Sequence, residues 1–361
     1  MWTKPYGNTG KDISVVGFGG MRFESPDETD AMAEIVLRAY DQGVNYFDTA
    51  PGYCGQKSEV IFGRAFEQMD RSKFYVSTKS NRPDDDELRK DLDTSLERMG
   101  VDCVDFFHIW WVLSKEAWEG RKAGGAIDAA MKAKEEGLIK HVVMSSHMHG
   151  PELKEVLAEG LVEGVTLGYC AINFPFRQEA VDAAGEMGLG VVTMNPLGGG
   201  IIPQHAERFA FLKDDGDESV VEAAIRFNVS QPNVTCALVG FSNAREVDEA
   251  VAAVRDFRAY DPQHVKAIEQ KVLESFDNLC TGCGYCLPCP EGVPIPQLMD
   301  TYNMKLLGQK DSMAGRMKWH WGIEPADARA CSLCGACETK CTQHLPIRER
   351  VKEIAEMKTE E

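Results

Sequence analysis

The feature that most constrains the fold is an eightfold alternation of short apolar runs with longer amphipathic ones over about the first 255 residues. Each run rich in Val, Ile and Phe is followed by a helical pattern, which is typical of a parallel sheet. Eight such units in about 250 residues predict an α/β fold, a closed (β/α)8 TIM barrel. A doubly wound open sheet is the alternative, but no G-x-G-x-x-G follows the first run. We expect strands over residues 13–19, 45–50, 73–79, 105–111, 140–146, 164–172, 190–197 and 235–242.

Residues 3–16 (TKPYGNTGKDISVV) predict a hairpin that turns at Asn-Thr-Gly and caps the barrel's N-terminal end. At the opposite end, the loops that follow the strands build the site of a barrel of this kind. Polar and aromatic residues gather at these strand ends: Asp48, Tyr53, Lys79, His108, Trp110, Trp111, Ser145, Ser146, His147 and Asn173. The pattern therefore predicts one functional rim.

The cysteines are distributed unevenly, since eight of the twelve lie between residues 280 and 341. They form two groups, CTGCGYCLPC and CSLCGACETKC, and three thiolates at two-residue gaps plus a distant fourth suit a [4Fe-4S] cluster. Two zinc sites are the alternative, although these usually come as separate C-x2-C pairs. The fourth cysteine of each ferredoxin run ligates the other cluster. We therefore assign one cluster to Cys280, Cys283, Cys286 and Cys341, and the other to Cys331, Cys334, Cys337 and Cys289.

This spacing departs from the usual ferredoxin run in two places. The first group puts its fourth cysteine after two residues rather than three, and Thr342 stands where a proline follows the second group. The change in composition also predicts the domain limits: a barrel over 1–260, a linking helix over 261–276, and a small, mainly helical ferredoxin-like domain over 277–361.

The net charge of −18 argues against nucleic acid and anionic membrane surfaces as partners, because both need basic patches. The N-terminus has no long apolar core of the kind a signal peptide carries. No stretch approaches about 18 uncharged apolar residues, so a membrane span is not expected. We expect a cytoplasmic protein.

Two stretches carry a resemblance to a known family. Residues 47–59 read FDTAPGYCGQKSE, and Thr78-Lys79 ends the next strand. This resembles the aldo-keto reductase family, and the GFGGMR stretch and the Ser145-Ser146 pair match in kind. The resemblance covers nearly all of residues 1–255, and the cysteine groups resemble the branch of the family with a fused ferredoxin-like 2[4Fe-4S] domain.

The resemblance implies that Tyr53 is a general acid. A phenol with a pKa near 10 is a poor proton donor, but a cationic Lys79 beside it would lower that pKa. Asp48 would orient and balance the lysine. The alternative is a buried Asp-Lys pair beside a core tyrosine.

The family's fourth active-site residue, a histidine five residues after the aspartate that opens strand four, is replaced here. Counting from Asp105 puts Trp110 at that place, with His108 on the same strand face about 7 Å deeper. His108 either reaches the site as a catalytic group or is a hydrogen-bonded core residue. Trp110 is the better candidate for a pocket wall on which a flat substrate stacks, with Trp111 and His147 beside it.

The residues expected to contact a nicotinamide cofactor also depart from the family pattern. Tyr169 replaces a glutamine ahead of Asn173, and Met194 replaces a stacking tyrosine. Around Gly240 and Ser242, Glu246 falls where a 2′-phosphate would require arginine, with Arg245 adjacent. Ser145 and Ser146 complete the predicted cofactor contacts. NAD(H), or no nicotinamide at all, is expected rather than NADP(H) bound by the usual contacts.

Three functions remain open from the sequence. The leading one is an anaerobic oxidoreductase that passes single electrons through two [4Fe-4S] clusters to a small organic substrate, with Tyr53 as proton donor. A ferredoxin, a flavodoxin or another donor protein would then be its partner. The second is an NAD(P)H-dependent carbonyl reductase with accessory clusters, and the third a non-catalytic electron-transfer or redox-sensing protein, against which Asp48, Tyr53 and Lys79 together argue.

Overall fold

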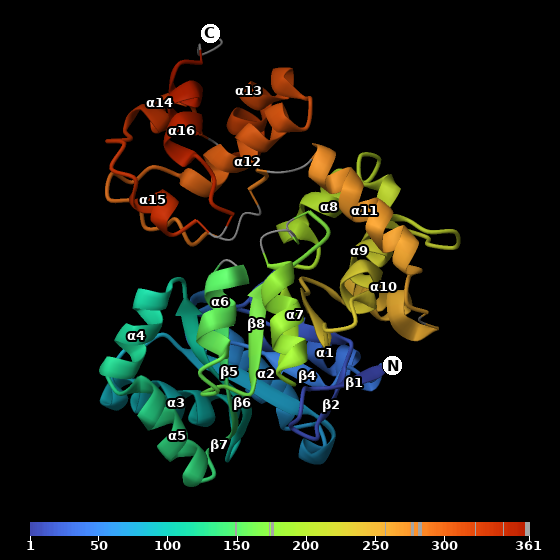
Figure 1. The fold of residues 1–361 in the computed structure, drawn as a ribbon, viewed down its shortest axis with the longest axis vertical. Coiled ribbons are helices and arrows are strands. Elements are labelled where there is room, and N and C mark those ends of the chain that lie inside the picture. Colours follow the sequence, from blue (N-terminus) through green and yellow to red (C-terminus); the bar gives the residue numbers. More distant parts are fainter. Residues whose placement is uncertain are drawn as a thin grey trace. The chain divides into compact units, whose positions relative to one another are not determined.

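The structure is a computed structural model that describes residues 1–148, 150–172, 174, 177–256, 258–275, 278–280, 284–321, 323–341 and 343–357. Eight parallel strands close into a barrel in the order β10-β3-β4-β5-β6-β7-β8-β9 (Figure 1). This confirms the predicted barrel. The strands are β3 (Val16–Gly19), β4 (Tyr46–Asp48), β5 (Tyr75–Ser80), β6 (Val104–Val112), β7 (Ile139–Ser146), β8 (Gly164–Gly168), β9 (Gly190–Met194) and β10 (Cys236–Gly240).

Amphipathic helices cover the outside of the barrel because their apolar stripes pack on the strands. Helix α3 is an example of the sequence signals that define them. Asp84 caps its start by accepting from the N–H of Glu87, and Gly100 ends it with φ of 63°. The barrel helices are α1 (Thr29–Asp41), α2 (Ser58–Phe66), α3 (Asp85–Met99), α4 (Lys115–Ala123), α5 (Ala126–Glu135), α6 (Gly150–Leu157), α7 (Gln178–Glu186), α8 (Ile201–Gln204), α9 (Val220–Ser230) and α10 (Ala244–Arg255).

A hairpin of β1 (Thr3–Pro5) and β2 (Asp12–Ser14) precedes the barrel, as predicted. Its Tyr6 ring lies against the starts of β8 and β9, where only glycine fits: a Cβ on Gly164 would lie 2.3 Å from the Tyr6 hydroxyl, and one on Gly190 would lie 2.1 Å from its ring. The prediction of one strand over 13–19 is wrong, because the hairpin takes its first part and β3 takes the rest. The ends predicted at 172 and 197 are also wrong, because pairing of β8 and β9 stops at Gly168 and Met194.

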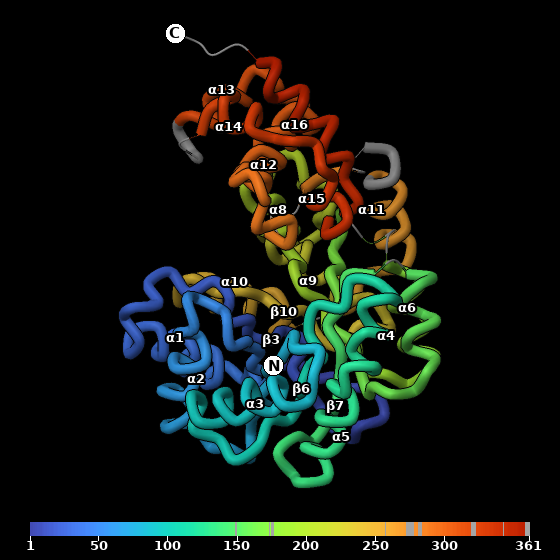
Figure 2. The backbone as a smooth tube through the Cα atoms, turned by 90° about the vertical axis from the view of Figure 1, so that its left-hand side faces the viewer, coloured from blue at the N-terminus to red at the C-terminus, as the bar shows by residue number. Residues whose placement is uncertain are grey.

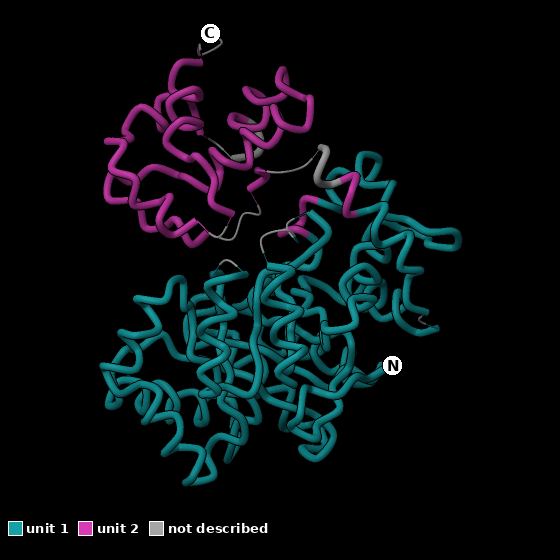
Figure 3. Tube along the Cα trace, viewed as in Figure 1, with its two compact units in different colours: residues 1–197, 202–268 teal, residues 198–201, 269–361 magenta. Residues whose placement is uncertain are grey.

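The structure divides into two compact units, one of residues 1–197 and 202–268 and the other of residues 198–201 and 269–361 (Figure 3). The predicted domain limits at 260 and 277 stay a prediction. No helix in the described ranges is long and apolar enough to cross a membrane.

The second unit is built mainly of short helices (Figure 2), which pack around their own apolar core. Gly308, Gly315 and Pro325 lie between or at the ends of these helices, where glycine and proline interrupt helical structure. Its elements are the end of α11 (Pro262–Ser275), α12 (Ile295–Leu306), η6 (Lys310–Ser312), α13 (Met313–Gly315), η7 (Arg316–Trp321), α14 (Pro325–Arg329), α15 (Ala336–Thr339) and α16 (Ile347–Ala355).

Candidate active site and iron–sulfur domain

A buried ion pair lies at the carboxyl end of the barrel. Asp48 ends β4 and Lys79 lies near the end of β5, and their Oδ1 and Nζ atoms are 2.6 Å apart with only 2% and 3% of the side chains exposed. The second carboxylate oxygen of Asp48 accepts from the Ser77 hydroxyl at 2.7 Å. Because Ser77 and Lys79 alternate with Thr78 along the strand, both point to the barrel interior. Asp48 is thus fixed at both oxygens.

Tyr53 lies beside this pair, at the start of the short helical turn η1 (Tyr53–Gln56). The ammonium of Lys79 is 5.4 Å from the centroid of the Tyr53 ring. The ring of Trp110 meets that of Tyr53 edge to face, with centroids 5.7 Å apart and planes at 87°. Three of the predicted rim residues, from β5, the β4 loop and β6, therefore come together. The lowered pKa expected for Tyr53 stays a prediction.

A pocket of about 430 Å³ opens at this place. It is lined by Lys79 and Trp110 together with Gly52, Thr94 and Arg98. A concave site that joins a charged group to an aromatic wall can hold a small polar molecule. Tyr53 is not among its lining residues, but it lies against two of them, Lys79 and Trp110. The pocket supports the prediction that Trp110 is a substrate wall.

His108 lies deeper in the barrel and has no exposed surface. Its Nε2 is 2.8 Å from the Thr166 hydroxyl of β8, and its Nδ1 is 3.3 Å from Ser77 Oγ. The proton of Ser77 goes to Asp48, and the Thr78 carbonyl, 3.4 Å from Nδ1, can only accept. Nδ1 of His108 must therefore carry the proton, and Nε2 must accept from Thr166.

Burial, with the cationic Lys79 as a second cause, lowers the pKa of His108 to about 3, so the ring is neutral at pH 7. The ring acts through Ser77 on Asp48 and does not line the pocket. This geometry supports the alternative in which His108 is a hydrogen-bonded core residue.

The end of β6 is irregular, and both tryptophans lie in the irregular part. The pairing of β6 with β7 shifts between Ile109 and Val112, and Trp111 has φ of 61°. Left-handed backbone is costly for a bulky residue. The carbonyl of Trp110 accepts from Arg121 of α4 at 3.3 Å. The bulge directs Trp110 to the rim, which is a common use of such irregularities near sites.

The serines and the histidine at the end of β7 are enclosed. The Ser146 hydroxyl donates to the Val112 carbonyl at 2.9 Å and accepts from the N–H of Met148, so it joins the ends of two strands. Ser145 is 2% exposed, and His147 is also buried. Burial, and then the charge of Arg177, hold the pKa of His147 well below its usual value. A cofactor role for the two serines and a substrate contact for His147 stay predictions.

The predicted nicotinamide contacts are dispersed. The Tyr169 hydroxyl donates to Gln178 of α7 at 2.5 Å, and its ring stacks on Phe227 of α9 at 6.1 Å, so the side chain belongs to the helix layer. Met194 ends β9 half-buried and Gly240 ends β10. Asn173 lies outside the described residues.

At the start of α10 a side chain already occupies the position where an anion would bind. Glu246 Oε2 accepts from the backbone N–H of Ser242 at 2.7 Å, and Asn243 caps the helix by accepting from the N–H of Glu246. A carboxylate at this N–H repels a nucleotide phosphate. The sequence suggested that the charge of Glu246 disfavours a 2′-phosphate, and the hydrogen bond from Ser242 gives that carboxylate a defined position.

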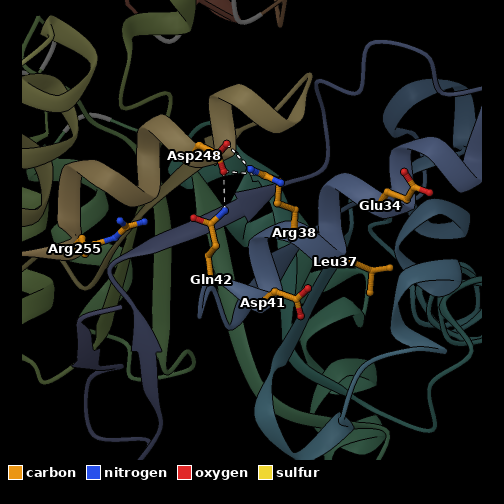
Figure 4. A pocket seen from close by; sticks show the side chains of 7 residues that line it. All are labelled: Glu34, Leu37, Arg38, Asp41, Gln42, Asp248 and Arg255. Carbon is orange, nitrogen blue, oxygen red and sulfur yellow. Dashed lines mark hydrogen bonds and ion pairs between the residues drawn. The ribbon is translucent and has the colours of Figure 1, made fainter.

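A second hollow, of about 520 Å³, lies between α1 and α10 and contains none of the predicted site residues (Figure 4). Three of its polar side chains are bonded to one another: Arg38 makes two hydrogen bonds to the carboxylate of Asp248, and Gln42 donates to the same group. Exposed pairs of this kind contribute little to stability, because water and salt screen them. We assign this hollow no chemistry.

In the second unit, one cavity is lined by Cys289, Cys331, Cys334 and Cys337, the four residues predicted for one cluster. Cys286, predicted for the other cluster, lies at the same cavity. Cys280 and Cys341 pack against the same apolar core, and the N–H of Leu345 points at Cys341 Sγ at 3.5 Å. Cys283 lies outside the described residues. Thiols are the ligands that [4Fe-4S] clusters use, and the crosswise assignment stays a prediction for each cysteine.

Sequence reasoning missed the supporting partners. Thr166 and Ser77 complete the network around Asp48, but hydroxyls inside strands are common and give no signal by themselves. Glu59, fully buried, accepts from Thr78 and Arg98 and connects β5 to α2 and α3. It could have been noticed as a charged residue within the FDTAPGYCGQKSE stretch.

Comparison with known proteins agrees with this architecture. The model of the aldo/keto reductase family matches residues 15–273, and that of a 4Fe-4S dicluster domain matches residues 279–346. L-galactose dehydrogenase of Arabidopsis thaliana is 28% identical over 307 residues, which cover 76% of this chain and 94% of the relative. NADH-specific methylglyoxal reductase of Escherichia coli is 24% identical, over 55% of this chain and 68% of the relative.

Two solved structures share the barrel. An aldo-keto reductase from Bacillus halodurans superposes with a TM-score of 0.65 at 19% identity, over 75% of this chain and 96% of its own. An aldo/keto reductase from Brucella melitensis gives 0.60 at 21% identity, over 74% and 98%. The dicluster match supports iron–sulfur clusters over zinc. The chain therefore belongs to the aldo/keto reductase family, as an oxidoreductase whose barrel is followed by a 4Fe-4S dicluster domain.

Proposed function

We propose that this enzyme reduces a small organic substrate in the barrel pocket with single electrons delivered through its two clusters, and that Tyr53 donates a proton. The observation that carries the proposal is the contact of Asp48 and Tyr53 with Lys79, which lines the pocket, together with a dicluster domain on the same chain. When bound, [4Fe-4S] clusters supply one electron each.

The barrel residues would handle the protons and the position of the substrate. A carbonyl that becomes an alcohol takes up two electrons and two protons. Tyr53 would give one proton to the oxygen, and solvent would give the other to carbon. The Lys79 ammonium, 5.4 Å from the ring centroid, would stabilise the phenolate left behind, and Asp48 holds that ammonium in place. Trp110 would cover the substrate face and exclude water.

Two departures from the family pattern support a reductant other than NADP(H). Trp110 stands where the family has a catalytic histidine, and Glu246 covers the N–H of Ser242, where a carboxylate disfavours a 2′-phosphate. We propose that a ferredoxin, a flavodoxin or another small donor protein charges the clusters.

The second candidate is an NADH-dependent carbonyl reductase with accessory clusters. It is favoured by the name of one relative, an NADH-specific methylglyoxal reductase. This candidate keeps the same proton donor, Tyr53, and differs only in the source of electrons. An experiment must therefore vary the reductant and not only the substrate.

The test is an anaerobic reduction assay with methylglyoxal as the probe carbonyl, comparing dithionite-reduced, NADH-supplied and NADPH-supplied protein while cluster absorbance is followed. We expect product only where the clusters are reduced, with cluster bleaching reversed as substrate is added. Tyr53→Phe, which keeps the ring against Trp110, should lower turnover by about 100-fold or more. Stoichiometric NADH oxidation by protein stripped of iron would refute the proposal and establish the second candidate.

A further inference from the structure

Arg350 is a buried cation in the second unit. It lies on α16 with 4% of its surface exposed. Its guanidinium carbon is 5.0 Å from the centroid of the Tyr302 ring of α12. Within the described ranges it has no ion pair, and its Nη1 has no hydrogen-bond acceptor. A buried charge without a counter-charge is costly, so an anion is expected beside it.

The other arginines of this unit contrast with it. Arg316 is paired with Asp300 at 2.8 Å, and Arg348, two residues before Arg350 on the same helix, is paired with Glu338 at 2.7 Å and half exposed. Among the arginines described in this unit, Arg350 is thus the buried one without an ion pair. Arg329 has none either, but it is exposed and donates to the backbone carbonyls of Ala355 and Met357.

Tyr302, on which Arg350 lies, connects it to a cysteine predicted for one cluster. Asn303, next to Tyr302, holds the backbone of Cys280 by two hydrogen bonds of 2.7 and 2.8 Å. Cys341 lies just before α16, against the apolar core that Tyr302 also contacts. Burial lowers the pKa of Arg350, while Tyr302, Cys280, Cys341 and then Glu349 raise it, so the two thiols act on Arg350 alongside one carboxylate. Arginine keeps its charge throughout.

We propose that Arg350 is the buried counter-cation of the cluster held by Cys280 and Cys341, and that it raises the reduction potential of that cluster relative to the other one. Reduction adds one electron, and hence one negative charge, to a thiolate-ligated cluster. A fixed cation in a low-dielectric site favours the reduced form, and the unpaired Nη1 can donate to a cluster sulfur. Among the described residues, those that line the cavity of Cys289, Cys331, Cys334 and Cys337 include Glu291 and no cation. The Arg348 guanidinium lies against Gly335 of this lining, but it is half exposed and paired with Glu338.

The consequence is an order of electron flow. The cluster beside Arg350 would accept an electron first, and the two clusters would titrate separately. This inference rests on the crosswise ligand assignment and not on the proposed substrate chemistry, so it can be tested without any substrate.

The experiment is an anaerobic redox titration of the full chain with dithionite and mediators, followed by EPR. Arg350→Gln removes the charge but keeps an N–H donor, and Arg350→Met removes both. We expect the equilibrium constant for reduction of one cluster to fall by about tenfold or more, which is about 59 mV per tenfold for a one-electron step, with the other cluster nearly unchanged. Arg350→Lys should restore part of the loss because it keeps the charge.

Arg348→Met is the matched control, because it removes an exposed, already paired arginine from the same helix. It should leave the reduction potential of the cluster beside Arg350 unchanged. The iron content of each variant is measured before its titration. If Arg350→Met loses iron, the Arg350→Gln protein is titrated instead. Two clusters that shift together, or neither shifting in a fully loaded Arg350→Gln protein, would overturn the proposal.

Discussion

Replacing His108 by glutamine should remove a specific part of the acid sensitivity of the barrel. His108 is fully buried and neutral, and its pKa of about 3 lies well below the value near 6.5 that histidine has in an unfolded chain. The unfolded state therefore takes up the proton first. Stability from His108 is fully present above about pH 6.5 and is lost as the pH falls toward 3.

The size of the effect follows from these two pKa values. Between them the unfolding free energy should fall by about 1.4 kcal/mol for each pH unit, and from pH 7 to pH 5 the loss is about 2 kcal/mol. In His108→Gln this loss should be absent. The variant should also be less stable than the wild type at pH 7, since glutamine does not reproduce both contacts to Ser77 and Thr166.

The assay is urea unfolding of both full-length proteins under anaerobic conditions at pH 5, 6 and 7, followed by far-ultraviolet circular dichroism. Both proteins share every other titrating group, His147 and the cysteines included, so the difference between them at each pH isolates His108. The slope of the unfolding free energy against urea concentration must be the same in both proteins, because this slope reports how much surface unfolding exposes. Parallel pH profiles, within about 0.5 kcal/mol, would show that His108 is not a buried neutral group and would refute the reasoning.

Three further predictions concern the ion pair, the nucleotide end and the clusters. Asp48→Ala leaves Lys79 buried without a partner and should lower the free energy of unfolding by about 3–5 kcal/mol, as measured in urea. The double variant Asp48→Leu/Lys79→Met should lower it by less, because no charge is left unpaired. Equal losses in the two variants would contradict the pairing. Glu246→Gln removes the carboxylate from the N–H of Ser242. It should raise the affinity for NADPH relative to NADH by several-fold, or about 1 kcal/mol, in a fluorescence titration. An unchanged ratio of the two affinities would argue against the repulsion. Cys334→Ser should lower the iron content by about half, whereas the barrel cysteine substitution Cys54→Ser should leave it unchanged; complete loss of iron would contradict two separately held clusters.

The barrel and the Asp48–Lys79 pair could be predicted because both depend on local rules. Apolar runs followed by helices indicate a parallel sheet, and residues at carboxyl strand ends must share one rim. The hairpin was predicted, but its boundary with β3 was not. Asp12–Ser14 pair with β1, whereas Val16 already pairs with Ala237 of β10, which is more than 200 residues away along the chain. Local sequence contains no information on such a contact.

The network around His108 shows a second limit. Its histidine could be placed one layer below Trp110 from the alternation of strand faces alone. Its partner Thr166 is 58 residues away, on a strand two positions further round the barrel. Which face of β8 meets His108 depends on strand stagger, which sequence patterns do not specify. The left-handed backbone of Trp111 was equally hidden, since tryptophan carries no preference for it.

The bulge at the end of β6 has a consequence for engineering. Trp110 and Trp111 form no pairs with β5 or β7, whose registers with β6 run through Ile109 and resume with β7 only at Val112. Side chains on this stretch can be exchanged without breaking the ladders that close the barrel. Asp48 and Lys79, by contrast, are paired residues of those ladders, and each neutralises the charge of the other. A library aimed at altering substrate preference should therefore vary positions 110 and 111 together and leave the ion pair untouched.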